Sequence, residues 1–215
     1  MLFVDRVDAG RRLADALSSY RGRTDVVVLG LPRGGVPVAR EVAIALPAPL
    51  DVLGVRKLGS PRHPEFAVGA IGEDGVRIVD EQSLRITGLS EEALAEVERR
   101  ERAELARRVA LFRSGRPRLD LTGRCAIVVD DGVATGATAT AGCRAARALG
   151  AEEVVLATPV APAGWTEWMQ AEADVLVAVA TPESFWAVGR WYRRFDQTSD
   201  AEVIACLASV DPARG

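Results

Sequence analysis

Side chains that bind transition metals are scarce in this sequence. It contains one histidine, His63, and three cysteines, Cys125, Cys143 and Cys206, that lie far apart along the chain. A structural zinc site needs about four Cys or His ligands, usually in closely spaced pairs, and no C-x-x-C pair is present. We therefore expect no such site and interpret the cysteines as small buried apolar residues.

Long apolar runs and a strong net charge are also missing. No hydrophobic stretch approaches the ~18 residues that a membrane span requires, and the N-terminus shows no charged segment followed by an apolar one, as a secretory signal would. The formal net charge of −3 argues against broad electrostatic binding to nucleic acid. We expect a cytoplasmic protein without membrane or nucleic-acid partners.

The composition is otherwise ordinary for a globular protein, and 215 residues suit one domain spanning 1–215. Short apolar runs alternate with helix-like segments, which indicates an α/β fold with a mainly parallel, doubly wound sheet and helices on both faces. Asp8 is the predicted cap of a first helix, Ser199 with Glu202 predicts the start of a last one, and Gly150 a helix end. The predicted strands are Val26–Leu29, Val52–Arg56, Ala126–Val129, Val154–Ala157 and Val175–Val179, with helices at about 36–46 and 137–149.

Two segments depart from this alternation. Residues 58–79 are rich in glycine and proline and contain a predicted hairpin from Ala67–Ile71 to Val76–Val79. Residues 90–113 are predicted to form one long charged helix that begins after Ser90 and has two acids in its first turn. Because its apolar positions are sparse, we expect a mostly solvated face or an oligomer surface.

The most informative segment runs from Ala126 to Thr138, with the sequence AIVVDDGVATGAT. Its apolar start predicts a strand whose C-terminal end carries Asp130 and Asp131, at the edge where open α/β sheets bind ligands. The following turn leads into a helix N-terminus, where free N–H groups suit a phosphate. Glycines that allow close backbone approach and threonines that add hydroxyl donors lie in this turn, at Gly132, Gly136, Thr135 and Thr138. Phosphate donors beside carboxylates that accept from vicinal hydroxyls predict a sugar phosphate as the ligand.

Other phosphate-binding motifs fit this segment less well. The turn GVATGAT lacks the lysine that follows the second glycine of a nucleoside-triphosphate P-loop. The G-x-G-x-x-G spacing of a dinucleotide site is absent from the turn and from the rest of the sequence. A purely structural alternative, in which the acids cap a helix after a strand, remains open.

The whole segment resembles the signature of type I phosphoribosyltransferases, which has four hydrophobic positions, two acids and then G-x-x-T-G-[AG]-T. The resemblance implies a Rossmann-like core over about 25–180. It also implies that Asp130 and Asp131 contact the ribose hydroxyls. The 5′-phosphate would be wrapped by the loop from Val133 to Thr138, which includes Ala134 and Ala137.

Upstream residues agree with this resemblance. In the family, the loop after the first core strand holds the pyrophosphate and often contains a non-proline cis peptide, and Arg33-Gly34-Gly35 occupies that place here. Arginine offers a planar fork to phosphate oxygens, and glycines let backbone N–H groups face the anion. Lys57, at the end of the second core strand, is the other predicted pyrophosphate contact. Without the resemblance, an ordinary turn and a solvated lysine would explain the same residues.

The resemblance also assigns roles to the remaining segments. A flexible loop at about 58–70, which contains Arg62 and His63, would close over the site during catalysis. The helix at 90–113 would be an insertion relative to the minimal core. A hood at about 181–199 would hold the acceptor, with Asp196 and Gln197 as candidate contacts. Its aromatic side chains would stack on a heterocycle or form a small satellite core; they are Phe185, Trp186, Trp191, Tyr192 and Phe195.

The implied reaction transfers ribose 5-phosphate from 5-phosphoribosyl 1-diphosphate to a nitrogen heterocycle and releases pyrophosphate, as in nucleotide metabolism. Arg33, Lys57 and Mg²⁺ would neutralise the leaving group, and the two acids would reach the metal through ribose hydroxyls or water. We expect a homodimer. The alternative is a regulator that senses the sugar diphosphate without turning it over.

One position departs from the family's pattern. Members that act on 6-oxopurines usually carry an aspartate three positions after the second acid, next to the base, and this chain has Ala134 there. The resemblance is therefore intact at the sugar-phosphate end and damaged at the acceptor end. Adenine-, uracil- and secondary-metabolite-type acceptors stay open.

Overall fold

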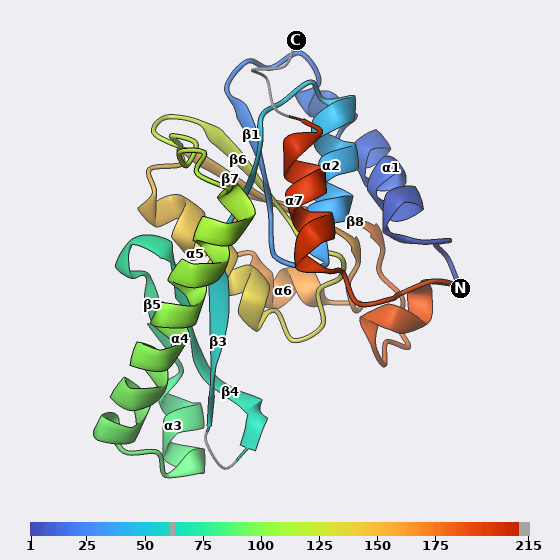
Figure 1. The fold of residues 1–215 in the computed structure, drawn as a ribbon. Coiled ribbons are helices and arrows are strands. Elements are labelled where there is room, and N and C mark those ends of the chain that lie inside the picture. The colour runs from blue at the N-terminus through green and yellow to red at the C-terminus, as the bar shows by residue number, and fades with distance from the viewer. Residues whose placement is uncertain (61–62, 211–215) are drawn as a thin grey trace.

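A five-stranded parallel sheet in the order β2-β1-β6-β7-β8 forms the centre of the molecule (Figure 1). The computed structural model describes residues 1–60 and 63–210, and for residues 60 and 63–67 the backbone only. The strands are β1 Val26–Gly30, β2 Leu50–Val52, β6 Cys125–Val129, β7 Glu153–Val160 and β8 Val175–Ala180. Near-continuous apolar runs such as these suit strands that are covered on both faces. The predicted α/β fold class is confirmed.

Helices cover both faces of this sheet (Figure 1). Alternate residues of β1 enter two different cores, with Val26 and Val28 in one and Val27 and Leu29 in the other. The first core is completed by α1 Arg6–Ala16, α2 Gly35–Ala45 and α7 Asp200–Ala208. The second is completed by α5 Ala137–Ala148 and α6 Trp165–Met169. Short 3₁₀ turns, η1 Ser18–Tyr20 and η3 Val188–Trp191, lie in the connections.

A second, antiparallel sheet lies to one side of the central one and is packed against α3 and α4 (Figure 1). Its strands are β3 Val55–Ser60, β4 His63–Gly72 and β5 Arg77–Val79, the last two joined by the turn η2 Glu73–Gly75, and the helices are α3 Glu81–Thr87 and α4 Glu91–Arg113. Leu58, Val68 and Ile71 of the strands meet Leu94 and Val97 of α4 in a third core. The predicted hairpin and the long helix are both confirmed.

The predicted strand Val52–Arg56 is wrong, because this apolar run belongs to two strands in different sheets. β2 ends at Val52 and β3 begins at Val55. Between them, the Gly54 N–H donates to Glu73 Oε1 at 2.8 Å, and a Cβ at Gly54 would lie 2.5 Å from Val109 Cγ2. Contacts with distant residues therefore separate the two strands, and hydrophobicity alone does not reveal them.

Residues 58–70 also differ from the irregular loop that their glycines and prolines predict. β3 pairs with β4 in this region, with Lys57 opposite Ala70 and Leu58 opposite Gly69. Ladder hydrogen bonds thus override a weak local propensity. Arg62 and the side chain of His63 lie outside the described residues. Closure of this segment over a ligand stays a prediction.

The helix caps agree with the sequence at two of three helix starts. Ser90 Oγ accepts from the Ala93 N–H at 3.3 Å, and Ser199 Oγ accepts from the Glu202 N–H at 3.1 Å. The prediction for Asp8 is wrong, since Asp5 has the extended backbone of a cap and accepts from two N–H groups of the first turn. Gly150 adopts φ +94°, the left-handed conformation predicted after a helix.

Predictions from composition are confirmed in part. Cys125 on β6 and Cys143 on α5 are buried, whereas Cys206 is only partly buried. Among the helices of residues 1–60 and 63–210, none is long and apolar enough to cross a membrane.

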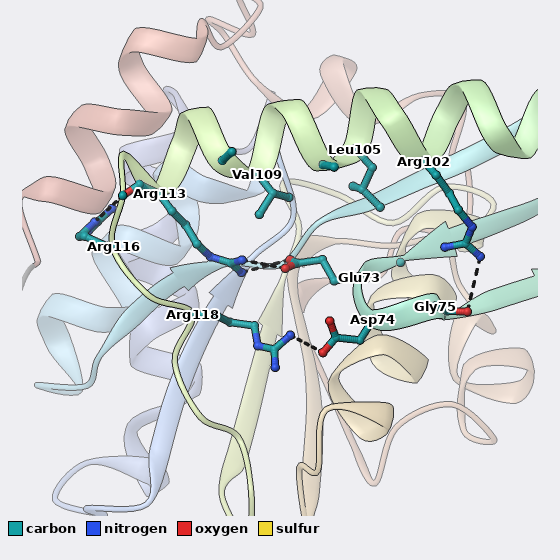
Figure 2. A pocket seen from close by; sticks show the side chains of 13 residues that line it. Glu73, Asp74, Gly75, Arg102, Leu105, Val109, Arg113, Arg116 and Arg118 are labelled. Atoms are coloured by element: carbon teal, nitrogen blue, oxygen red, sulfur yellow. Dashed lines mark hydrogen bonds and ion pairs between the residues drawn. The ribbon is translucent and has the colours of Figure 1, made fainter.

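An ion-pair network, of which Figure 2 shows the pair Arg113–Glu73, fixes the C-terminal end of α4. Arg113 Nε donates to Asp51 Oδ1 at 3.1 Å, and Arg113 Nη1 donates to Glu73 Oε2 at 2.7 Å. The Nη2 group also reaches the Val52 carbonyl at 2.9 Å. Beside this network, α4 and the η2 turn enclose a cavity of about 550 Å³, and no residue of the loop 130–138 is among its described lining residues. One arginine therefore joins α4 to β2 and to the second sheet.

We predict that Arg113→Met destabilises the fold by about 3–5 kcal/mol, because it leaves two buried carboxylates without a cation. Arg99→Met on the exposed face of α4 is the matched control, with an expected change below about 0.5 kcal/mol. Urea unfolding followed by circular dichroism measures both. Equal stability of the two variants would contradict the clamping role of Arg113.

Candidate active site

The loop between β6 and α5 lies at the carboxyl edge of the central strand of the sheet. Gly136, immediately before α5, adopts φ +77°, and a Cβ there would lie 2.2 Å from the Trp168 ring. Both the backbone conformation and the close packing therefore require glycine. The predicted residues Gly132 to Thr138 line a cavity of about 90 Å³ together with Asp130 and Lys57. The structure thus brings Lys57 to the loop from within β3 of the second sheet, and not from the end of a core strand as the sequence predicts.

The loop after β1 packs directly against the acid pair. A Cβ at Gly34 would lie 2.0 Å from Asp131 Oδ2, and one at Gly35 would lie 2.5 Å from the Val129 carbonyl. The Pro32–Arg33 peptide bond is cis, as the resemblance implies. Arg33 does not line the cavity that Lys57 shares with the loop; its Nη1 lies 3.4 Å from Asp200 Oδ1 at the start of α7. The two predicted loops are therefore in contact, while the Arg33 guanidinium is turned to α7.

Burial raises the pKa of both Asp130 and Asp131. Burial raises the pKa of Asp130, and the neighbouring Asp131 charge raises it further, against the opposing effect of Lys57 and Arg6. Burial likewise raises the pKa of Asp131, although the Arg6 guanidinium acts in the opposite direction. Two carboxylates held in this way favour the arrival of a cation or of hydroxyl donors.

Arg6 is a site residue that the sequence did not reveal. Its Nε and Nη2 lie 2.9 and 2.8 Å from Asp131 Oδ2, and its Nη1 donates to the Asp196 carbonyl at 2.7 Å. The guanidinium carbon lies 4.0 Å from the centre of the Phe195 ring. A partner 125 residues away in the chain leaves no local pattern. A correct prediction of Asp5 as the cap of the first helix would have placed Arg6 at the start of that helix.

The hood segment 181–199 adjoins the loop on the side of Gly132, where a Cβ would lie 2.3 Å from Val188 Cγ1. Most of its aromatic side chains pack on one another and on Phe3, which matches the satellite-core interpretation. Trp186 differs, since it is 79% exposed. Tyr192 donates its hydroxyl to the Asp131 carbonyl at 2.5 Å. Asp196 and Gln197 line a cavity of about 290 Å³ with Arg6.

Fold and loop together define a class: a doubly wound α/β protein whose central strand ends in an acid pair and a helix N-terminus. A family model described as "Phosphoribosyl transferase domain" matches residues 4–190. The chain belongs to this phosphoribosyl transferase family.

Individual relatives agree with the family. Over 206 residues the chain is 58% identical to "Putative phosphoribosyl transferase Rv0571c" of Mycobacterium tuberculosis H37Rv, a match that covers 96% of this chain and 46% of that protein. The protein "Putative phosphoribosyl transferase MT0597" from the CDC 1551 strain of the same species matches equally. The crystal structure of TT1426 from Thermus thermophilus shares 42% identity and a TM-score of 0.82, over 97% of this chain and 99% of that one. The chain spans just under half the length of the two curated Mycobacterium tuberculosis relatives.

We predict that Asp130→Asn stabilises the unliganded protein at high pH. Because the folded-state pKa of Asp130 is raised, its ionised form destabilises the fold at pH 9, and this cost is absent below the unfolded-chain pKa of about 4. Residue 130 of the variant is uncharged at every pH. We therefore expect the free energy of unfolding of the variant to exceed that of the wild type by about 1 kcal/mol or more at pH 9 and to equal it near pH 4. Urea unfolding across this range is the measurement. A variant less stable than the wild type at pH 9 would contradict the pKa direction.

Proposed function

We propose that this chain transfers ribose 5-phosphate from 5-phosphoribosyl 1-diphosphate to a nitrogen heterocycle. The C1–O bond to the diphosphate breaks, a C1–N bond forms, pyrophosphate leaves and the acceptor nitrogen loses its proton. One observation carries the proposal: Asp130, Lys57 and the loop Gly132–Thr138 line a single cavity, against which the loop Arg33–Gly35 packs. This arrangement supports a phosphate site beside one carboxylate and one cation, with Asp131 and the loop Arg33–Gly35 adjoining it.

In this proposal each group acts on a different part of the sugar diphosphate. The N–H groups and threonine hydroxyls of the loop bind the 5′-phosphate at the α5 N-terminus. Asp130 and Asp131 accept from the ribose hydroxyls and oppose the positive charge that develops at C1 in an oxocarbenium-like transition state. Lys57 and the Arg33–Gly35 loop bind the diphosphate.

The acid pair also fits Mg²⁺ in part. Among the described residues, no group of three or more His, Cys, Asp or Glu side chains is arranged to hold a metal. Mg²⁺ keeps several waters and binds largely through substrate phosphates, so in this proposal Asp130 and Asp131 reach it through ribose hydroxyls or water. Bound there, it would neutralise the leaving diphosphate. A homodimer and a cytoplasmic location stay predictions.

We predict that hypoxanthine and guanine are poor acceptors. Ala134 lines the cavity of the loop and offers a methyl group where a carboxylate would manage the proton of a 6-oxopurine. Such acid–base assistance is worth about 10²–10⁴ in rate. We therefore expect kcat/KM at least about 100-fold below that of the best acceptor in a screen of heterocycles with Mg²⁺, followed by pyrophosphate release.

Two variants at position 134 test whether a carboxylate there changes the choice of acceptor. Ala134→Asp is expected to raise the activity with hypoxanthine, whereas Ala134→Ser, similar in size but not acidic, is not. Hypoxanthine or guanine as the best acceptor of the wild type would overturn the Ala134 argument. Tight binding of the sugar diphosphate without pyrophosphate release from any acceptor would favour the sensing regulator.

A further inference from the structure

A second cavity joins the candidate active site to α4. It has a volume of about 280 Å³ and shares Lys57 and Thr138 with the cavity of the phosphate loop. Pro32, the first residue of the cis peptide, belongs to its lining. The opposite wall is one face of α4, formed by Leu105, Arg108, Val109 and Phe112. α4 therefore borders the side of the site that Lys57 and Pro32, the residue before Arg33, line.

The residues that line this cavity carry positive charge. Arg56, Lys57 and Arg108 line it and none of its described lining residues is acidic, although Arg56 forms an ion pair with Glu101, which does not line the cavity. Arg108 Nε donates to Glu104 Oε1 at 2.6 Å, but the same carboxylate also accepts from Arg107 Nε at 2.8 Å. One acid is thus shared by two guanidiniums, and the group keeps a net positive charge. Lys57 and the partly compensated Arg108 in one cavity without an acid in its lining suit a polyanion.

We propose that Arg108, together with Lys57, binds the diphosphate of 5-phosphoribosyl 1-diphosphate. The inference rests on the proposed function. With the 5′-phosphate at the α5 N-terminus and the ribose on the acid pair, the diphosphate lies between Lys57 and the loop after β1, next to this cavity. A guanidinium can donate two parallel hydrogen bonds to phosphate oxygens, which a lysine cannot. On this account α4 is part of the binding site, and its charged face is more than a solvated surface.

The test compares two ligands and two neighbouring arginines by calorimetry with Mg²⁺. Arg108→Ala is expected to weaken binding of 5-phosphoribosyl 1-diphosphate about 10- to 100-fold, the usual effect of losing hydrogen bonds to a charged group. Binding of ribose 5-phosphate, which lacks the diphosphate, is expected to change by less than about twofold. Arg107→Ala is the matched control, because Arg107 shares Glu104 but does not line the cavity, and it is expected to leave both affinities unchanged. Thermal unfolding verifies that each variant is folded, and Arg108→Gln replaces Arg108→Ala if the latter is not.

Three results would overturn this inference alone while leaving the proposed function in place. In the first, Arg108→Ala binds the sugar diphosphate as tightly as the wild type. In the second, Arg108→Ala weakens the binding of both ligands equally. In the third, Arg107→Ala weakens the binding of the sugar diphosphate as much as Arg108→Ala does. Wild-type protein that binds neither ligand would overturn the proposed function and this inference with it.

Discussion

The contacts of Asp131 hold four separate parts of the chain at one point. Its carboxylate accepts a hydrogen bond from Arg6 Nε of α1 and forms an ion pair with the same guanidinium, and the absence of a side chain at Gly34 leaves room for it beside the loop after β1. Its carbonyl receives the Tyr192 hydroxyl of the hood. Arg6 in turn donates to the Asp196 carbonyl. Since these contacts fix the relative positions of both predicted loops and the hood, the geometry of the whole site depends on them.

The buried acid pair lowers the stability of the unliganded fold, and in our proposal it holds the site in its binding geometry. Two adjacent carboxylates in a partly dry environment oppose each other, and their raised pKa values show that the unliganded fold disfavours their charge. A ligand that brings hydroxyl donors and a cation relieves this opposition, so binding energy does not have to rearrange the site. Arg113 joins the C-terminal end of α4 to Asp51 and Glu73, and in our proposal it thereby also positions the α4 side of the site.

The sequence predicted what depends on local chemistry and missed what depends on distant contacts. The strand, acid pair and glycine-rich turn of residues 126–138 are contiguous, so their arrangement followed from the order of residues alone. Arg6 was missed because its partner is far away in the chain. The strand break at Gly54 was missed because it depends on Glu73 and Val109. The hairpin at 58–70 was missed because pairing with a second strand outweighs glycine and proline content.

The most direct test of this account is calorimetric titration of 5-phosphoribosyl 1-diphosphate with Mg²⁺ into the wild type and the Asp130→Asn, Asp131→Asn double variant. The exposed-acid variant Asp74→Asn serves as the control. Unpaired ribose hydroxyls cost about 1–3 kcal/mol each, so we expect the double variant to lose at least about tenfold in affinity and the control to match the wild type. Unchanged affinity in a folded double variant would contradict the claim that this acid pair binds the sugar diphosphate.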